Sequence, residues 1–208
     1  MEDISIKTAD MKMISMESKN GKIRRKNNYN FVHKTLKALD FAMTIHKYQF
    51  RKDGITPYIT HPIQVVNILY SWGIFDPTTI SIAYLHDVIE DVDISYQSPE
   101  KLYKQLIFEF GTFIANGVKL LSIQSNETKV EYISRISRST FRMYLLYIKA
   151  ADRIHNTYCF LNEGKADYAK IYLHKADEIF NTIKNSKNDE VLINRISFER
   201  YRLLGLMK

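Results

Sequence analysis

The stretch ISIAYLHDVIED, residues 80–91, decides how this sequence folds. Its apolar residues leave almost no polar face, which is typical of a helix buried at the centre of a protein. Just before it, Asp76 and Pro77 form a helix start signal, because aspartate caps a helix and proline fits its first turn. We therefore expect a central helix that begins at Pro77 and continues through this stretch.

Helical periodicity continues on both sides of this segment. The other expected helices cover residues 31–50, 62–72, 98–111, 112–122, 127–139, 140–162, 165–184 and 187–205, with approximate boundaries. The chain has only seven glycines and four prolines, which argues against a sandwich or barrel of many short strands. The sequence predicts an all-α fold with a single domain over residues 29–208.

Composition limits the function classes. Hydrophobic residues make up 45% and charged residues 25% of the 208, the balance of a globular protein. The formal net charge of +7 favours an anionic partner. Residues 1–28 hold a basic cluster without a sustained apolar period, and we expect them to form a flexible arm. No basic stripe interleaved with aromatic residues follows, so a nucleic-acid partner is not expected.

The expected location is the cytoplasm. No apolar window approaches the length of a membrane span, and the amino terminus lacks the pattern of a signal peptide. A single cysteine, Cys159, fits a reducing compartment. Because it lies in an apolar run, we interpret it as a small buried hydrophobic residue rather than a catalytic thiol.

Four ionisable residues lie within the apolar stretch and are candidates for a functional site, namely His86, Asp87, Glu90 and Asp91. Burying such groups is costly unless they are paired or bind a metal ion. An isolated His-Asp pair is usually part of a solvated helix face, but here the apolar neighbours leave little room for one. The pattern therefore indicates a metal site with a second acidic pair, Glu90 and Asp91, for acid-base work.

Two ligands do not hold a catalytic metal ion well, so further ligands are expected from elsewhere. The candidates are His61, at the start of the preceding helix, and Asp152, in the run KAADRIHN of residues 149–156. Two imidazoles and two carboxylates suit Mn²⁺ or another divalent cation with positions open to water and substrate oxygens. Such an arrangement is typical of a hydrolase.

Five ordered blocks give a more specific resemblance. They are HKYQFRKDG at 46–54, PYITHP at 57–62, LHDVIED at 85–91, Phe110-Gly111, and KAADRIHN at 149–156. In this order they resemble the hydrolase domain of the RelA/SpoT alarmone enzymes, especially its small stand-alone members, from about Ala38 to Leu161. The resemblance implies a single helical domain of the HD superfamily.

The resemblance also implies an activity and a set of site residues. The activity is removal of pyrophosphate from the 3′ position of guanosine tetra- or pentaphosphate, with Mn²⁺ and without synthetase activity. The implied metal ligands are His61, His86, Asp87 and Asp152. The implied catalytic pair is Glu90 and Asp91. The implied substrate contacts are Arg51 at the base, Lys52 near phosphate, and Lys149 and Asn156 in the pocket.

Several alternatives stay open. Arg51 and Lys52 could form a solvated charge pair, Lys149 could extend to solvent, and Asn156 could satisfy backbone groups. We interpret His46 as a hydrogen-bonded core residue, and the resemblance does not support His155 as a ligand.

Function and assembly also remain open in part. After Asn156 the family usually has a methionine or leucine and an arginine, whereas this chain has Thr157-Tyr158-Cys159, so one phosphate-side contact of the family has no match here. The alternatives are a phosphatase acting on NADPH or another ribose-phosphorylated nucleotide, and an inactive nucleotide-binding HD domain. The sequence does not predict an oligomeric state.

Overall fold

In the part of the chain that the structure describes, the regular elements are α-helices. The computed structural model describes residues 21–92, 97–124, 126–185 and 190–207. The helices are α1 (Gly21–Ile45), α2 (Thr60–Ser71), α3 (Pro77–Leu85), α4 (Pro99–Leu121), α5 (Lys129–Arg138), α6 (Arg142–Asn162), α7 (Ala166–His174), α8 (Asp177–Asn185) and α9 (Glu190–Leu206). Within these residues, one isolated β-bridge joins Phe50 and Pro57 in the α1–α2 loop. The prediction of an all-α fold is confirmed.

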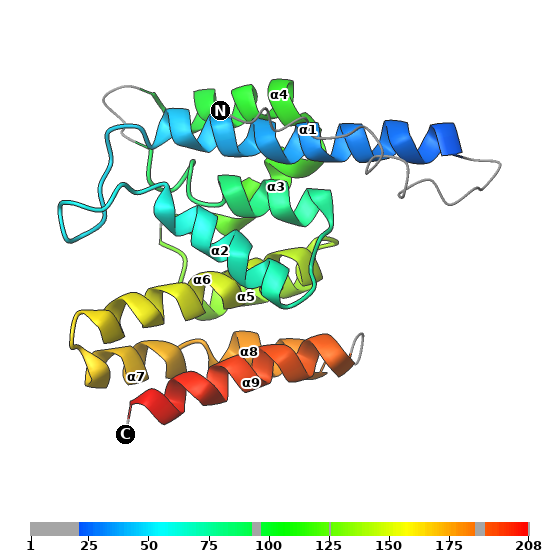
Figure 1. Ribbon diagram of the computed structural model, residues 1–208. Coiled ribbons are helices and arrows are strands. Elements are labelled where there is room, and N and C mark those ends of the chain that lie inside the picture. Colours follow the sequence, from blue (N-terminus) through cyan, green and yellow to red (C-terminus); the bar gives the residue numbers. More distant parts are fainter. Residues whose placement is uncertain (1–20, 93–96, 125, 186–189, 208) are drawn as a thin grey trace, which may run out of the picture.

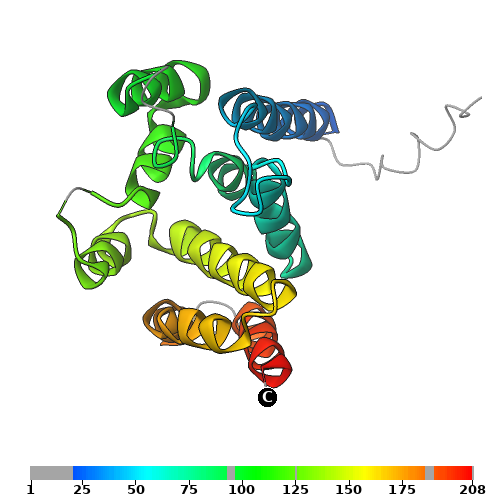
Figure 2. The ribbon, with the colours of Figure 1, turned by 90° about the vertical axis from the view of Figure 1, so that its left-hand side faces the viewer.

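The helices pack in successive layers. Figure 1 shows α1 and α4 at one end of the molecule, α2 and α3 next to them, α6 across the middle, and α7 to α9 at the other end. The view in Figure 2, turned by 90°, shows α6 between the α2–α3 pair and the last three helices. Helix α6 contacts both groups, and its residues Leu145, Leu146, Ile148 and Ile154 are fully buried. Any polar residue on α6 that faces α2 or α3 therefore lies deep in the fold.

Helix α3 is central, as its apolar sequence predicts. It contacts α1, α2, α4 and α6. Asp76 caps it by accepting a 2.8 Å hydrogen bond from the backbone nitrogen of Thr79, and Pro77 occupies the first turn. These are the capping and start signals that the sequence contains.

The end of α3 was predicted wrongly. The helix stops at Leu85 instead of continuing through Asp91, and residues 86–90 form turns. The backbone nitrogen of Val88 donates to the Leu85 carbonyl at 3.1 Å, a three-residue spacing that tightens the chain out of the α-helix. Val88 is nevertheless fully buried, which is why the apolar pattern continued past the end of the helix.

Other boundaries differ less. Helix α1 begins at Gly21, before the expected start near Phe31. Residues 21–28 were expected in the flexible arm but belong to α1, so this part of the prediction is wrong. Residues 1–20 lie outside the described residues, and for them the flexible arm stays a prediction. Gly111 interrupts α4 with φ 82° and ψ 163°, where a helix end was expected, and both halves belong to one kinked element. The expected helix 165–184 is divided into α7 and α8 by a turn in which Ala176 donates to the Leu173 carbonyl.

Within the described residues, every helix is too short or too polar to cross a lipid bilayer. The cytoplasmic location stays a prediction.

Candidate metal centre and pocket

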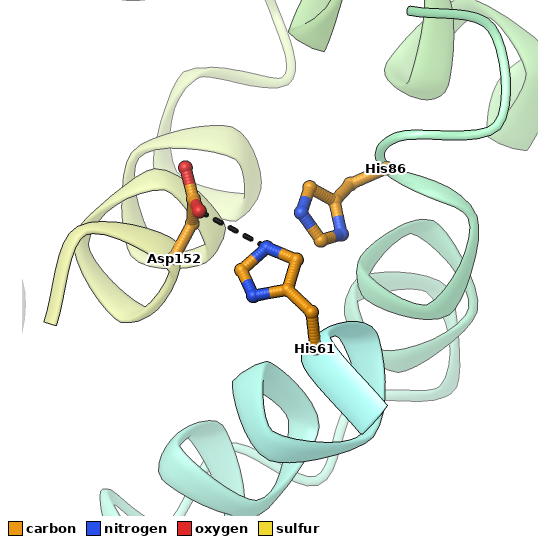
Figure 3. Close-up of side chains that lie close together, drawn as sticks. All are labelled: His61, His86 and Asp152. Atoms are coloured by element: carbon orange, nitrogen blue, oxygen red, sulfur yellow. Dashed lines mark ion pairs between the residues drawn. The ribbon is translucent and has the colours of Figure 1, made fainter. Parts of the chain in front are cut away.

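Three side chains from separate parts of the sequence converge at the centre of the fold. His61 lies in the first turn of α2, His86 directly follows α3, and Asp152 lies in the middle of α6. One ligand atom from each residue lies within 4.8 Å of the others, and all three residues are buried. Figure 3 shows the three side chains pointing toward one another. These residues are among the four that the sequence predicts as metal ligands.

His86 has the donor geometry of a metal ligand. Its Nδ1 lies 2.7 Å from the Ala83 carbonyl, which can only accept, so Nδ1 carries the proton. In the neutral ring Nε2 is then left with a lone pair. This atom is buried and makes no hydrogen bond within the described residues. It lies 3.0 Å from Asp87 Oδ2. A buried ring nitrogen that faces a carboxylate oxygen without a hydrogen bond is uncommon, and here it fits coordination of both atoms to a cation.

Asp87, the fourth predicted ligand, lies at the edge of the cluster. Its Oδ2 is 3.0 Å from His86 Nε2 and 3.4 Å from His61 Nε2. The hydroxyl of Tyr58 donates to the same oxygen at 2.8 Å and also contacts the Asp91 carboxylate. Tyr58 therefore links a predicted metal ligand to the predicted catalytic pair. We assigned no role to Tyr58 from the sequence, although it lies three residues before His61.

Electrostatics at the cluster fit a cation between the carboxylates. His61 Nε2 lies 3.2 Å from Asp152 Oδ1. Burial by itself lowers the pKa of His61, but hydrogen bonds to Asp152 and Asp87 raise it to about 9. Burial also raises the pKa of Asp152, yet Lys149 and His61 hold it below its usual range. In the metal-free site, a proton on His61 thus balances the negative charge of the carboxylates. A divalent cation that binds here would take the place of this proton.

Lys149 and Asn156 support Asp152. Lys149 is 9% exposed and its Nζ lies 2.9 Å from Asp152 Oδ2, so it does not extend to solvent. Asn156 Nδ2 donates to Asp152 Oδ1 at 2.6 Å, and its Oδ1 accepts a 2.7 Å hydrogen bond from Arg51. Arg51 is therefore not part of a solvated charge pair. A continuous polar network runs from the α1–α2 loop to α6.

The cluster opens into a cavity of about 770 Å³. Nine of the ten predicted site residues line it: Arg51, Lys52, His61, Asp87, Glu90, Asp91, Lys149, Asp152 and Asn156. His86 is not among the lining residues. Burial, with the charges of Asp87 and Asp91, raises the pKa of Glu90, and Lys149 acts in the opposite direction. The cavity has the size of a small-molecule site.

An aromatic wall of the cavity was not foreseen from the sequence. Phe160 at the end of α6 lies edge-on to Tyr168 and Tyr172 of α7. The guanidinium of Arg153 lies 4.1 Å from the centre of the Tyr172 ring. Tyr168 and Tyr172 are four residues apart, and this spacing indicates that they share one face of α7. It does not show which cavity that face lines.

His46 and Cys159 are not among the ten predicted site residues, but the sequence also predicted their surroundings. His46 is 2% exposed and its Nδ1 lies 2.5 Å from Gln49 Oε1, which confirms a hydrogen-bonded core histidine. Cys159 was expected in the core but is partly exposed and lines the cavity. It is seven residues after Asp152, two helical turns, and so shares the cavity face of α6 rather than the packed face.

Comparison with known proteins places the fold and the site in a family. The family model described as HD domain matches residues 38–187. A probable guanosine-3′,5′-bis(diphosphate) 3′-pyrophosphohydrolase from Synechocystis sp. is 33% identical over 124 residues, 58% of this chain and 16% of that protein. The guanosine-3′,5′-bis(diphosphate) 3′-pyrophosphohydrolase MESH1 of Xenopus tropicalis is 30% identical over 123 residues, 58% of this chain and 66% of that protein.

A solved structure is similar over most of its length. It is that of a metazoan ortholog of SpoT described as hydrolysing ppGpp and playing a role in starvation responses. It superposes with a TM-score of 0.62 at 25% identity, covering 83% of this chain and 96% of that one. The chain thus spans a small part of the Synechocystis relative, about two thirds of the frog protein, and nearly all of the solved one. Since the HD domain model matches well over half of the sequence, the chain belongs to the HD domain family.

Proposed function

We propose that the chain is a Mn²⁺-dependent hydrolase that removes the 3′-pyrophosphate of guanosine tetra- and pentaphosphate. The observation that carries the proposal is Nε2 of His86, which makes no hydrogen bond within the described residues and lies 3.0 Å from the Asp87 carboxylate. It is buried beside His61 and Asp152 at the base of a cavity that Glu90 and Asp91 line. Relatives named as 3′-pyrophosphohydrolases of guanosine bis(diphosphate) support this substrate class.

The proposed metal ligands are His61, His86, Asp87 and Asp152. When bound, a divalent cation would lower the pKa of water and offset the negative charge of a phosphoryl group. The ligand atoms come from α2, the turn after α3, and α6. Tyr58 and Lys149 hold the two carboxylates in place through contacts of 2.8 and 2.9 Å.

The proposed catalytic pair, Glu90 and Asp91, faces the cavity beside the ligands. Glu90 is exposed there and has a raised pKa, which suits a group that takes a proton from water. Asp91 contacts the Tyr58 hydroxyl and is held next to Asp87. In the overall reaction water adds across the bond between the 3′ oxygen and phosphorus. The hydroxyl goes to the phosphoryl group and the proton goes to the ribose oxygen.

The proposed substrate contacts include positively charged side chains that line the cavity. Arg51 is held by Asn156 and lies with its guanidinium 5.6 Å from the centre of the Tyr58 ring, leaving it oriented for a base or phosphate. Lys52 is exposed at the cavity and can neutralise a phosphate. Lys149 and Asn156 act at the metal side, where both contact Asp152.

The test is product analysis with purified protein and Mn²⁺. Guanosine 3′,5′-bis(diphosphate) and NADPH are each supplied as substrate, and pyrophosphate and phosphate are measured separately. Wild type is compared with His86→Ala and Glu90→Gln, and with Glu178→Gln as an exposed carboxylate control on α8.

We expect GDP and pyrophosphate from wild type and the control, and loss of both products in the two site variants. Phosphate from NADPH alone would replace the proposal by a ribose-phosphate phosphatase. Nucleotide binding without any turnover would replace it by an inactive nucleotide-binding domain.

A further inference from the structure

Both ring nitrogens of His61 make close polar contacts. Nε2 faces the carboxylates of Asp152 and Asp87 at 3.2 and 3.4 Å. Nδ1 lies 2.7 Å from Nδ1 of His155, whose ring centre is 4.9 Å from that of His61. His155 thus lies against the side of His61 that faces away from the proposed cation.

The chemistry of the site fixes the direction of this hydrogen bond. Two ring nitrogens at 2.7 Å share one proton, so one donates and the other accepts. If His61 Nε2 presents a lone pair to a cation, the neutral ring carries its proton on Nδ1. His61 then donates and His155 accepts. The same direction holds when His61 carries both protons, so the bond need not reverse when a cation binds.

The position of His155 suits an acceptor. It lies three residues after Asp152 on the same face of α6, so one helix positions both Asp152 and the acceptor for His61. With its Nδ1 accepting, the proton of His155 is on Nε2, which lies 3.9 Å from the sulfur of Cys159. The same sulfur lies 4.0 Å from Nδ1, so this weak acceptor does not select between the two ring nitrogens, and the contact with His61 decides the tautomer.

The second imidazole of the cluster is held in the same way by a different group. His86 donates its Nδ1 proton to the Ala83 carbonyl at 2.7 Å. Ligating histidines usually donate their second ring N–H to such an acceptor, which fixes the ring and its tautomer. His61 has His155 where His86 has a backbone carbonyl.

We propose that His155 is a positioning residue whose Nδ1 accepts the proton of His61 Nδ1 and holds His61 Nε2 toward the metal site. This inference rests on the metal site of the proposed function. Substitution of partners of this kind reduces metal affinity by about 10- to 100-fold. The effect on metal affinity does not depend on which nucleotide the protein acts upon.

The test measures metal affinity in the absence of substrate. Metal-free protein is titrated with Mn²⁺, with free ion read by electron paramagnetic resonance, and with Co²⁺, read by visible absorption. His155→Phe keeps a ring but has no acceptor, His155→Leu has neither, and His155→Asn places a side-chain oxygen near the position of Nδ1. His174→Phe is the control, because His174 is exposed on α7, away from the cavity residues.

We expect His155→Phe and His155→Leu to weaken Mn²⁺ binding by about 10- to 100-fold, His155→Asn to retain most of it, and His174→Phe to match wild type. The Co²⁺ spectrum should change in the Phe and Leu variants. Circular dichroism of each metal-free variant shows which variants have folded. If only one of His155→Phe and His155→Leu folds, that one is enough for the test.

Other results have distinct meanings. Wild-type affinity in a folded Phe or Leu variant would overturn the role of His155 and leave the proposed function standing. Equal weakening in the Asn and Phe variants would overturn it too, because the acceptor would then not be the cause. Absence of metal binding in wild type, or unchanged binding in His86→Ala, would remove the metal site and the inference together.

Discussion

Replacing Lys149 by methionine should destabilise the metal-free protein far more than removal of an exposed lysine from an ion pair. Lys149 is 9% exposed, and its Nζ lies 2.9 Å from Asp152 Oδ2. Methionine preserves most of the volume and leaves the buried carboxylate without this cation. Lys165 offers a matched control, because it pairs with Glu163 at 2.6 Å but its side chain is 59% exposed.

The expected loss of unfolding free energy depends on how deeply the ion pair is buried rather than on its N–O distance. Breaking a buried ion pair by removing one partner costs about 3 to 5 kcal/mol. Asp152 keeps its contacts with Asn156 and His61, so we expect the lower end, about 3 kcal/mol, for Lys149→Met. For a chain of this length that corresponds to a fall in Tm of about 6 to 12 °C. An exposed pair contributes about 0 to 1 kcal/mol, so Lys165→Met should lower Tm by at most about 4 °C.

Thermal unfolding followed by circular dichroism, with and without Mn²⁺, tests this reasoning. In the presence of Mn²⁺ the gap between Lys149→Met and wild type should narrow, because a bound cation supplies positive charge beside Asp152. Equal losses of Tm in the two lysine variants without metal would refute the argument from burial. A gap that Mn²⁺ leaves unchanged would mean that a bound cation does not offset the loss of Lys149 beside Asp152.

Three further predictions concern the proposed catalytic pair, a helix contact and an ion pair. Glu90→Gln should lower kcat by about 10²- to 10⁴-fold with little change in Mn²⁺ affinity, measured by initial rates and calorimetry. Gly117→Ala should destabilise by about 1 to 3 kcal/mol in urea unfolding, because the new Cβ would lie 2.5 Å from Ile82 Cδ1 where α4 meets α3. The hydrogen bond from Arg135 lowers the pKa of Glu127 in the folded state. Their pair therefore stabilises the fold above the unfolded pKa of about 4.3 and loses this effect as pH falls through the folded value. Arg135→Met should lower Tm more at pH 7 than at pH 3.

The helical class and the position of the site could be predicted because both depend on local patterns. Apolar periodicity and the Asp76-Pro77 signal predicted α3, and the scarcity of glycine and proline excluded a sandwich. The ionisable residues were noticed because a buried charge needs a partner, a requirement that holds whatever the fold. The roles of these residues came from ordered motifs, and the catalytic and substrate-binding roles stay predictions.

Residues that act through space could not be found in this way. His155 and His61 are 94 positions apart, and their contact exists because α2 packs on α6. Tyr58 lies in a motif, but its two carboxylate partners are on the turn after α3. Periodicity reports which face of a helix is buried, not which residue of another helix meets it.

The end of α3 at Leu85 explains how one short stretch can provide both the proposed ligands and the proposed catalytic acids. On a continuous helix, His86 and Glu90 would lie one above the other on one face, about a full turn apart. In the turn that replaces it, His86 is buried with its Nε2 in the cluster, whereas Glu90 and Asp91 are exposed at the cavity. Asp87, between them, contacts both groups through His86 and Tyr58. The apolar residues Val88 and Ile89 anchor this turn in the core. Backbone hydrogen bonds from Val88 to Leu85 and from Asp91 to Asp87 also hold it. The apolar pattern that led us to extend the helix is thus the feature that fixes the geometry of the site.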